Sequence, residues 1–394
     1  MNTEILQEDV QYFIQEHLND DINTLILKGS PFANIDIKIL ANQIEAKKKC
    51  EYKLPTWFTT KNIIYPPKLS IEQTSSEITA QYKSQLFSRE KLIDATGGFG
   101  VDCYYFSKQF KEVHHCEIQE DLSNIVHHNN LQLQINNCTT HAVNGIDFII
   151  NNPNLYDVIY IDPSRRNDSK GKVFMLEDCL PNVPEHLNEL LKKGKIILVK
   201  TSPILDISNG LQSLQLITEI HIVAVNNEVK ELLWIIDSEI HNDLTIKTIN
   251  IKNDHTVEQL NFNYQQLQQA IATYAEPQQF IYEPNAAILK SGAFALLSEL
   301  LKIDKLAIHS HLYTSKHLID FPGRSFKIEK VYPYQKKQLK KTFKNTKANI
   351  TTRNFPESVA VIRKQLGIHD GGDVYLFFTT DLNQKKIVIV ASKI

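Results

Sequence analysis

Residues 92–102 read LIDATGGFGVD and give the strongest indication of how this chain folds. An apolar run ends in Asp94, a glycine-rich turn follows, and a helical pattern starts after Gly100. Glycines directly after a strand let the backbone turn tightly and let a ligand approach the start of the next helix. The stretch therefore predicts a strand, a ligand-binding turn and a helix of an α/β sheet.

Two further acids follow short apolar runs, where later strands are expected to end. Glu117 closes the second run, and the pair Asp162-Pro163 closes a later one. A carboxylate such as Asp94 would repel a pyrophosphate, but it suits the cationic methionyl part of S-adenosylmethionine (SAM). The three acids favour a SAM site and methyl transfer. A nucleotide-binding oxidoreductase, whose glycine-rich turn is related, is the competing class.

The order of the predicted strands supports the same choice. Strand and helix patterns alternate from residue 90 to about 238, which predicts a parallel, doubly wound, Rossmann-like α/β sheet. Strands are expected at 91–95, 113–117, 140–143, 158–162 and 195–200. Two more, 219–225 and 231–237, are joined by a loop too short for a parallel crossover, so they form a hairpin. A parallel sheet that ends in a hairpin is the arrangement of class I methyltransferases.

The composition is that of an ordinary globular protein. The 394 residues are 42% hydrophobic and 22% charged, with a net charge of −2. No apolar stretch approaches the ~20 residues of a membrane span, and the N-terminus lacks a signal-peptide pattern. We therefore expect a cytoplasmic protein without a membrane segment. The five cysteines form no CxxC pair and the histidine pairs 114–115 and 127–128 lack a ligand spacing, so we expect no disulfides and no metal. The oligomeric state stays open.

The regions on either side of this sheet have their own patterns. Residues 1 to about 65 show mostly helical spacing, and Thr74 with Glu77 forms a capping box that opens a helix leading to the first strand. Beyond residue 240 the pattern changes to an α+β mixture. It predicts helices at 265–275 and around 286–301, and closing strands at 374–380 and 386–391.

The candidate cofactor residues follow the first three strands. The methionyl end of SAM is assigned to Asp94, Thr96, Gly97, Gly98 and Gly100. Glu117, with Ile118 beside it, lies where Rossmann-like sheets bind ribose hydroxyls; the alternative is a solvated loop acid. Asn144, Gly145 and Asp147 follow the third strand, where an amide or an acid can meet the adenine amino group. Either Asn144 or Asp147 fits, and one of them can instead cap the next helix.

The candidate reactive motif is Asp162-Pro163-Ser164-Arg165, at the carboxyl end of the fourth strand. Enzymes that methylate exocyclic amines of bases often present an acid, two prolines and an aromatic there. Here Ser164 replaces the second proline and Arg165 the aromatic, although a guanidinium also stacks on bases. The alternative is a strand-ending turn with a solvated arginine pair.

Uracil C5 methylation is a further chemistry to weigh, because its enzymes carry an Asp-Pro-x-Arg variant of this motif. They also need a cysteine nucleophile after the fifth strand. Residues 199–203 read VKTSP there, and Cys179 is expected on a helix, so thiolate chemistry is not supported.

The C-terminal region carries the strongest charge signal. From Lys316 to Arg353 there are eleven Lys or Arg residues and two acids, a local net charge of +9, with aromatic residues between them. Such a pattern suits phosphate contact and base stacking, so RNA is the expected partner. The alternative is a solvated, lysine-rich helix face. The residues assigned to RNA are Arg166, Arg324, Lys336, Lys337, Lys340 and Lys341.

Nearly the whole chain resembles a bacterial family of class I methyltransferases that carry ferredoxin-like and C-terminal THUMP-like domains. The resemblance lies in the loop from Asp94 to Gly100 and in the motif 162–166. It extends to the segments 72–83 (EQTSSEITAQYK), 282–287 (YEPNAA), 312–315 (LYTS) and 321–326 (FPGRSF).

The resemblance implies SAM as cofactor and an RNA-binding C-terminal end. The domains expected are an N-terminal helical region 1–70, a methyltransferase domain 71–240, a ferredoxin-like domain 241–322 and a THUMP-like domain 323–394. The function expected is methyl transfer to a base of structured RNA, either rRNA or tRNA. The alternatives are a protein methyltransferase and a non-catalytic RNA-binding protein on a methyltransferase scaffold.

Overall fold

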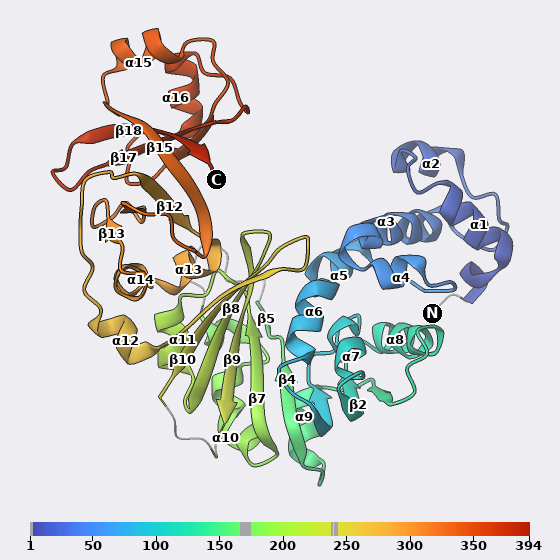
Figure 1. Cartoon of the computed structure of the whole chain (residues 1–394). Coiled ribbons are helices and arrows are strands. Elements are labelled where there is room, and N and C mark those ends of the chain that lie inside the picture. The colour runs from blue at the N-terminus through green and yellow to red at the C-terminus, as the bar shows by residue number, and fades with distance from the viewer. Residues whose placement is uncertain (1–2, 166–174, 238, 240–242) are drawn as a thin grey trace. The chain divides into compact units, whose positions relative to one another are not determined.

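The computed structural model describes residues 3–165, 175–237, 239 and 243–394 (Figure 1). The chain divides into two compact units. The first contains Met1–Thr218 and Leu232–His241, and the second contains Glu219–Glu231 and Asn242–Ile394. The division into four domains expected from the sequence stays a prediction.

The N-terminal region is helical, as expected. Its elements are η1 (Thr3–Leu6), α1 (Glu8–Glu16), α2 (Ile22–Lys28), α3 (Ile37–Lys53), α4 (Pro55–Thr59), α5 (Lys68–Gln73) and α6 (Glu77–Ser84). The expected capping box is wrong: Ser76, not Thr74, caps α6 by accepting from the Thr79 N–H at 3.3 Å. Glu77 cannot reach back to a cap, because its carboxylate accepts from Thr56 N and from the Tyr105 hydroxyl, both at 2.6 Å.

A nine-stranded sheet has the order β11-β10-β8-β9-β7-β4-β1-β2-β3. Its strands are β1 (Arg89–Asp94), β2 (Phe110–Cys116), β3 (Cys138–His141), β4 (Tyr156–Ile161), β7 (Gly194–Thr201), β8 (Ile217–Val225), β9 (Glu228–Asp237), β10 (Thr245–Ile251) and β11 (Val257–Asn263). The helices between them are α7 (Val101–Phe106), α8 (Glu120–Gln132), α9 (Gly145–Asn151), α10 (Val183–Leu191) and α11 (Ile207–Ser213). Strands β3, β2, β1, β4 and β7 pair in parallel, so their carboxyl ends meet at one edge.

The sheet reverses at a hairpin, as the sequence predicted. Strand β9 runs antiparallel to β7, and the turn between β8 and β9 is Asn226-Asn227. Both residues have positive φ, 51° and 65°, which a two-residue hairpin turn requires and asparagine tolerates. Strands β10 and β11 then extend the same sheet beyond residue 240.

A second sheet in the C-terminal part has the order β13-β14-β12-β15-β18-β17-β16. Its strands are β12 (Phe280–Pro284), β13 (Asp304–Lys305), β14 (Tyr313–Ser315), β15 (Gly323–Pro333), β16 (Asn349–Thr352), β17 (Val374–Thr380) and β18 (Lys386–Lys393). Helices α15 (Lys336–Phe343) and α16 (Val359–Leu366) bury Leu339 and Ile362 in one core with residues of β17 and β18. The closing strands expected at 374–380 and 386–391 are confirmed as β17 and β18.

Two helices differ from the expectation. The Gln-rich helix α12 is only Tyr264–Gln269 and does not reach residue 275. None of its residues is buried, so it has no packed apolar face that would stabilise a longer helix. The helix expected around 286–301 is two helices, α13 (Ala286–Ser291) and α14 (Phe294–Leu301). Gly292 separates them with a φ of 74°, which ends the first helix.

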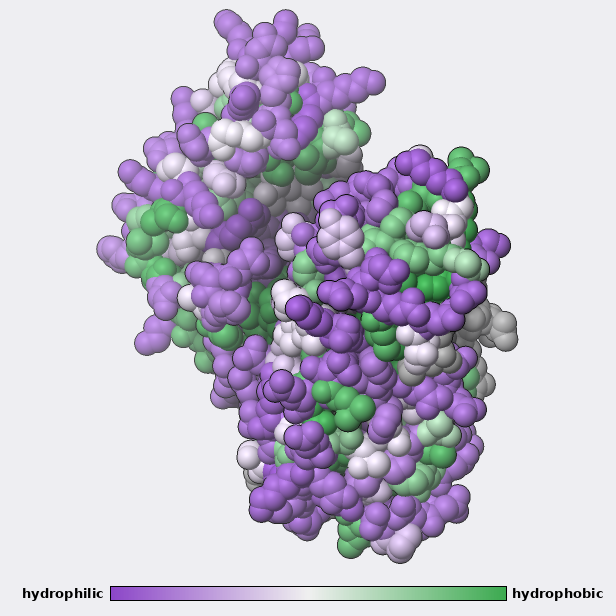
Figure 2. Space-filling model, turned by 90° about the vertical axis from the view of Figure 1, so that its right-hand side faces the viewer, coloured by the Kyte–Doolittle hydropathy of each residue, from purple (hydrophilic) through white to green (hydrophobic). Residues whose placement is uncertain are grey.

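The face drawn in Figure 2 is mostly hydrophilic, with hydrophobic residues in small separate groups. In the described residues, no helix is both long and apolar enough to cross a membrane. All five cysteines are free thiols, and four of them are buried.

Candidate functional site

Asp94 ends β1 and is almost fully enclosed, with 1% of its surface exposed. Its carboxylate accepts from Thr96 N at 2.9 Å and from the Thr96 hydroxyl at 3.3 Å, and the Cys103 thiol donates to it at 3.4 Å. Burial raises the pKa of Asp94 to about 8, and the charges of Asp102 and Asp162 add to that rise. Asp94 therefore holds the loop together and does not face solvent.

Thr96 connects the end of β1 to the end of β4. Its Oγ1 atom accepts from the Asp162 N–H at 2.7 Å while donating to Asp94. One hydroxyl thus fixes two of the predicted site carboxylates next to each other.

The glycine-rich loop connects β1 to β2. Gly97 N donates to Cys116 O at 2.8 Å, and Gly98 N donates to the Glu117 carboxylate at 3.1 Å. A Cβ atom on Gly97 would lie 2.3 Å from the ring of His115, so no larger residue fits there. Gly98 and Gly100 have φ values of 53° and 78°, in the left-handed region that favours glycine.

The ring of His115 packs against this loop. The ring is fully buried, and burial lowers its pKa to about 4, so it is neutral at neutral pH. Its Nε2 atom lies 3.2 Å from the Gly98 carbonyl, which can only accept, so Nε2 carries the proton. Glu117 is half-buried and also accepts from Gln119 N at 2.8 Å, whereas Ile118 is exposed.

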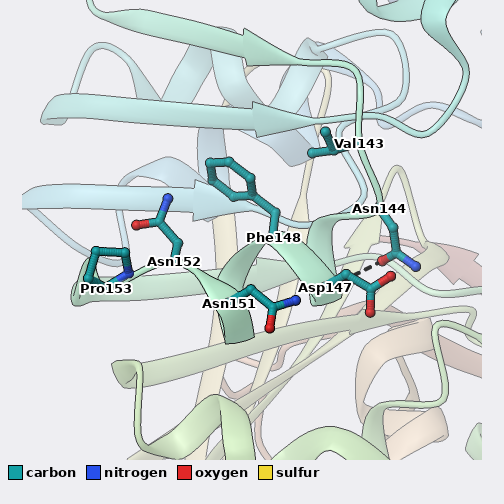
Figure 3. Close-up of a pocket in the computed structure, with 7 residues that line it drawn as sticks. All are labelled: Val143, Asn144, Asp147, Phe148, Asn151, Asn152 and Pro153. Carbon is teal, nitrogen blue, oxygen red and sulfur yellow. Dashed lines mark hydrogen bonds between the residues drawn. The ribbon is translucent and has the colours of Figure 1, made fainter.

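The residues after β3 lie along α9. Gly145 packs against the Ala95 backbone, since a Cβ there would lie 2.2 Å from the Ala95 carbonyl oxygen. Asn144 caps the helix by accepting from Ile146 N at 3.0 Å, and Asp147 is exposed. Both line an open hollow of about 580 Å³ that runs along α9 to Pro153 (Figure 3). Only the Asn144 end of this hollow reaches the carboxyl edge of the sheet, so the hollow as a whole does not define the site.

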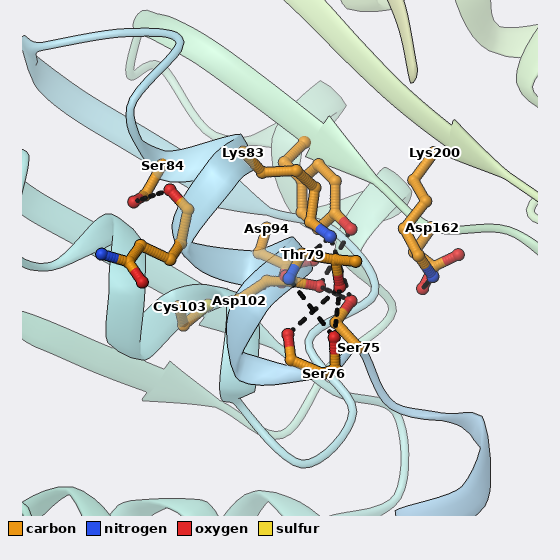
Figure 4. A network of polar contacts seen from close by, with 12 residues as sticks. Ser75, Ser76, Thr79, Lys83, Ser84, Asp94, Asp102, Cys103, Asp162 and Lys200 are labelled. Carbon is orange, nitrogen blue, oxygen red and sulfur yellow. Dashed lines mark hydrogen bonds and ion pairs between the residues drawn. The ribbon is translucent and has the colours of Figure 1, made fainter. Parts of the chain in front are cut away.

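Asp162 follows β4 and forms an ion pair with Lys200 of β7 (Figure 4). Pro163 is buried, whereas Ser164 is exposed and its hydroxyl donates to Leu180 O at 3.4 Å. Ser164 and Arg165 form the short strand β5 (Ser164–Arg165), which pairs with β6 (Cys179–Leu180). Cys179 is therefore in a strand, and the expected helix there is wrong. Arg166 lies outside the described residues.

A buried polar network beside the loop was not predicted as part of the site. Lys83 of α6 has no exposed surface and pairs with Asp102 of α7 at 3.2 Å. Ser75 and Tyr160 donate to the same carboxylate at 2.8 and 3.0 Å (Figure 4). Burial alone would raise the pKa of Asp102, but the charges of Lys83 and Lys200, together with the hydrogen bonds from Ser75 and Tyr160, hold that pKa below its usual value.

These missed residues left traces in the sequence. Ser75 and Lys83 lie in the segment 72–83 that the family resemblance marks, without any indication of chemistry. Lys200 lies in the stretch 199–203, where the absence of a cysteine was the feature considered. A lysine at a strand end has no motif that distinguishes it from a solvated lysine.

The predicted RNA-binding residues of the C-terminal part lie in two places. Lys336, Lys337, Lys340 and Lys341 are exposed on α15, whose Leu339 and Phe343 are buried. Arg324 is instead bound to the buried carboxylate of Glu283, which also pairs with Arg353 at 2.6 Å. Across the described residues, no cluster of three or more potential metal ligands occurs.

Three direct contacts thus join the predicted cofactor residues at one edge. The Thr96 hydroxyl joins Asp94 to Asp162, Gly98 N joins the loop to Glu117, and Gly145 packs on Ala95. Asn144, Asp147 and Ile118 lie further out, on exposed surface.

Several known proteins match this chain. A family model described as a ferredoxin-like domain matches residues 280–322, and one described as THUMP domain-like matches residues 323–393. A crystal structure of a candidate methyltransferase from Porphyromonas gingivalis W83 shares 30% identity with a TM-score of 0.88, covering 99% of this chain and 98% of that one. No curated protein matches.

Two more distant structures match part of the chain. TrmK of M. capricolum, in complex with S-adenosyl-homocysteine, is 15% identical with a TM-score of 0.32, and the match covers 42% of this chain and 71% of that one. An rRNA methylase from Streptococcus thermophilus is 13% identical with a TM-score of 0.30, covering 41% and 93%.

The sheet order, the hairpin and the second sheet agree with what the resemblance implied. The Porphyromonas protein matches over nearly its whole length, and the two family models account for residues 280–393. This chain therefore belongs to the family of class I methyltransferases that carry ferredoxin-like and THUMP-like domains in their C-terminal part.

Proposed function

We propose that this protein is a SAM-dependent methyltransferase that transfers a methyl group to a base of structured RNA, rRNA or tRNA. The observation that carries the proposal is the convergence of Asp94, Thr96, Gly98, Glu117 and Asp162 at one sheet edge through direct hydrogen bonds. Ligands of open α/β sheets bind at this edge, where the strand order reverses between β1 and β4.

The residues at this edge fit SAM. Glu117 is half-buried at the end of β2, where its carboxylate can accept from ribose hydroxyls while Gly98 N and Gln119 N fix it. A Cβ atom on Gly98 would lie no closer than 3.8 Å to another atom, so this part of the loop leaves its backbone open to a ligand. Asp94 supports this loop by binding Thr96, which makes it a positioning residue for the methionyl end. When bound, SAM supplies a methyl group on a positively charged sulfur.

Asp162 is the proposed catalytic residue. It lies at the carboxyl end of β4, is partly exposed, and is fixed through its backbone N–H by Thr96. A carboxylate there can accept a hydrogen bond from the amine of an acceptor base and thereby direct the nitrogen lone pair. Ser164 and Arg165 follow on β5 and are the proposed contacts to the target nucleotide.

The basic C-terminal surface supports RNA as the acceptor. The exposed lysines of α15 lie within the part matched as THUMP-like, and they suit contacts to phosphate. Arg166, Arg324 and the α15 lysines complete the proposed RNA contacts. An enzyme of this kind would act in the cytoplasm, where structured RNA is found.

The test is methyl transfer from tritiated SAM to total cellular RNA by the full chain. Wild-type protein should label RNA, and Asp162→Asn should lose about 100-fold or more in turnover while binding RNA equally. Label in protein but not in RNA would support the protein-methyltransferase alternative. RNA binding without label in any fraction would support the non-catalytic alternative.

A further inference from the structure

Lys200 occupies a defined position beside the proposed catalytic acid. In the parallel register of β4 and β7, Ile161 lies opposite Val199, so Asp162 and Lys200 follow at adjacent places on the carboxyl edge. The ammonium group of Lys200 bonds the Oδ2 atom of Asp162. The Lys200 side chain is 13% exposed and the Asp162 side chain is 29% exposed, so the pair is partly shielded from water.

The backbone that carries Lys200 is held rigidly. Strand β7 lies between β4 and β9, and Lys200 is in register with Leu233. The next residue, Thr201, is buried and its hydroxyl accepts from the Trp234 indole at 2.9 Å. The side chain of Lys200 therefore starts from a fixed point, which favours a single direction for its ammonium group.

Several charged groups lie close to Asp162. Lys200 on β7 contacts Asp162, Asp94 on β1 lies close enough for the two carboxyl groups to interact, and Lys83 of α6 is paired to Asp102 of α7. Figure 4 shows this group. Lys83 serves Asp102, so Lys200 is the described cation in contact with Asp162.

We propose that Lys200 is a positioning residue for methyl transfer: it binds Oδ2 of Asp162, so that Oδ1 faces the acceptor amine. The inference rests on the function proposed above and adds a residue that no motif marks. In the described part of the chain, Oδ1 of Asp162 has no hydrogen bond, and the side chain is partly exposed, as such a role requires.

The chain offers a matched control at the opposite end of the same two strands. Lys195 pairs with Asp157 at 2.7 Å at the amino ends of β7 and β4. Lys195 is 56% exposed, and its pair lies away from the carboxyl edge. The variant Lys195→Met therefore removes the same charge from the same strand without touching the site.

The experiment compares wild-type protein with Lys200→Met, Lys200→Arg and Lys195→Met. Methyl transfer from tritiated SAM is measured over a range of RNA concentrations. In Lys200→Met, kcat should fall by about 10- to 100-fold while the KM for RNA stays within about twofold, because the orientation of Asp162 is lost and RNA binding is not. Lys200→Arg should recover most of kcat, and Lys195→Met should change neither constant. Calorimetric binding of S-adenosylhomocysteine should stay within about twofold in all variants.

One result would overturn the role of Lys200, and another would overturn the proposed function. Equal kcat of wild type and Lys200→Met, with methyl transfer to RNA by both, shows that Lys200 does not position Asp162. Absence of methyl transfer by the wild type instead overturns the proposed function. If Lys200→Met does not fold, Lys200→Gln gives the same readout with a polar side chain of similar length.

Discussion

The carboxyl edge of the nine-stranded sheet and the outer face of α15 both carry charged residues, but they hold them in opposite ways. At the sheet edge, Asp94 and Asp102 are buried, and each is bonded to at least two named partners. On α15, Lys336, Lys337, Lys340 and Lys341 are exposed, and Lys336 pairs with Glu357 at 3.1 Å. The function of the sheet edge should therefore depend on the exact positions of single side chains. RNA binding by α15 should instead depend on the total number of positive charges. Single substitutions should have large effects at the edge and graded, salt-dependent effects on α15.

The largest effect is expected from the buried pair beside the loop. Lys83→Met should leave Asp102 charged and enclosed, which costs about 3–5 kcal/mol of unfolding free energy. Urea unfolding, followed by the near-UV signal of the full chain, measures this loss. The double variant Lys83→Met/Asp102→Leu should recover most of it, because two apolar residues replace two charges. A loss of less than about 1 kcal/mol in the single variant would show that the buried edge tolerates charge as the surface does.

A smaller effect is expected from the acid at the end of β2. Glu117→Ala removes a charged acceptor from the proposed ribose site, so S-adenosylhomocysteine should bind about 10- to 150-fold more weakly, which is about 1.5–3 kcal/mol. Equilibrium dialysis with labelled ligand measures the change. Glu120→Ala, an exposed acid at the start of α8, is the control and should bind as wild type does. Equal binding by both variants would mean that Glu117 is a solvated loop acid.

RNA binding by the exposed face of α15 should instead depend on the salt concentration. Removing Lys336, Lys337, Lys340 and Lys341 together should reduce the slope of log affinity for RNA against log salt, by about 0.7–0.9 for each phosphate that the helix no longer neutralises. Turnover at saturating RNA should hardly change, because only uniform binding is removed. Removing Lys28, Lys38, Lys49 and Lys61 from the N-terminal region is the control of equal charge. A salt slope that falls equally in both variants would leave α15 as an ordinary solvated face.

A separate effect concerns pH. The pKa of Asp94 is raised from 3.8 to about 8 in the folded protein, so its neutral form favours folding at low pH. This contribution is fully present below about pH 4 and is lost as the pH rises through about 8. Asp94→Asn stays neutral, so its melting temperature should gain on that of wild type between about pH 4 and 8, with no further change at higher pH. A constant difference between the two melting curves would show that Asp94 is ionised throughout this range.

Much of the first sheet could be predicted from the sequence, because apolar runs ending in acids mark strands directly. The strands around Asp94, Glu117 and Asp162 were found within a few residues, and the hairpin after residue 217 follows from loop length alone. The glycine loop was also found, since Gly98 and Gly100 adopt the conformations that only glycine adopts easily. Local chemistry was sufficient for all of these features.

The features that were missed depend on contacts between distant segments. Lys83 meets Asp102 only when α6 packs on α7, and Lys200 meets Asp162 only because β7 pairs with β4. The pairing of β10 with β8 likewise joins strands that no local pattern assigns to one sheet. The capping box at Thr74 failed for the same reason, because Glu77 is taken by Thr56 and Tyr105.

The most direct test of the proposed site is a calorimetric titration of the full chain with S-adenosylhomocysteine and, separately, with NADH. The carboxyl edge of the nine-stranded sheet should bind S-adenosylhomocysteine at a single site and should not bind NADH. Binding of NADH without binding of S-adenosylhomocysteine would contradict the proposal and would favour an oxidoreductase.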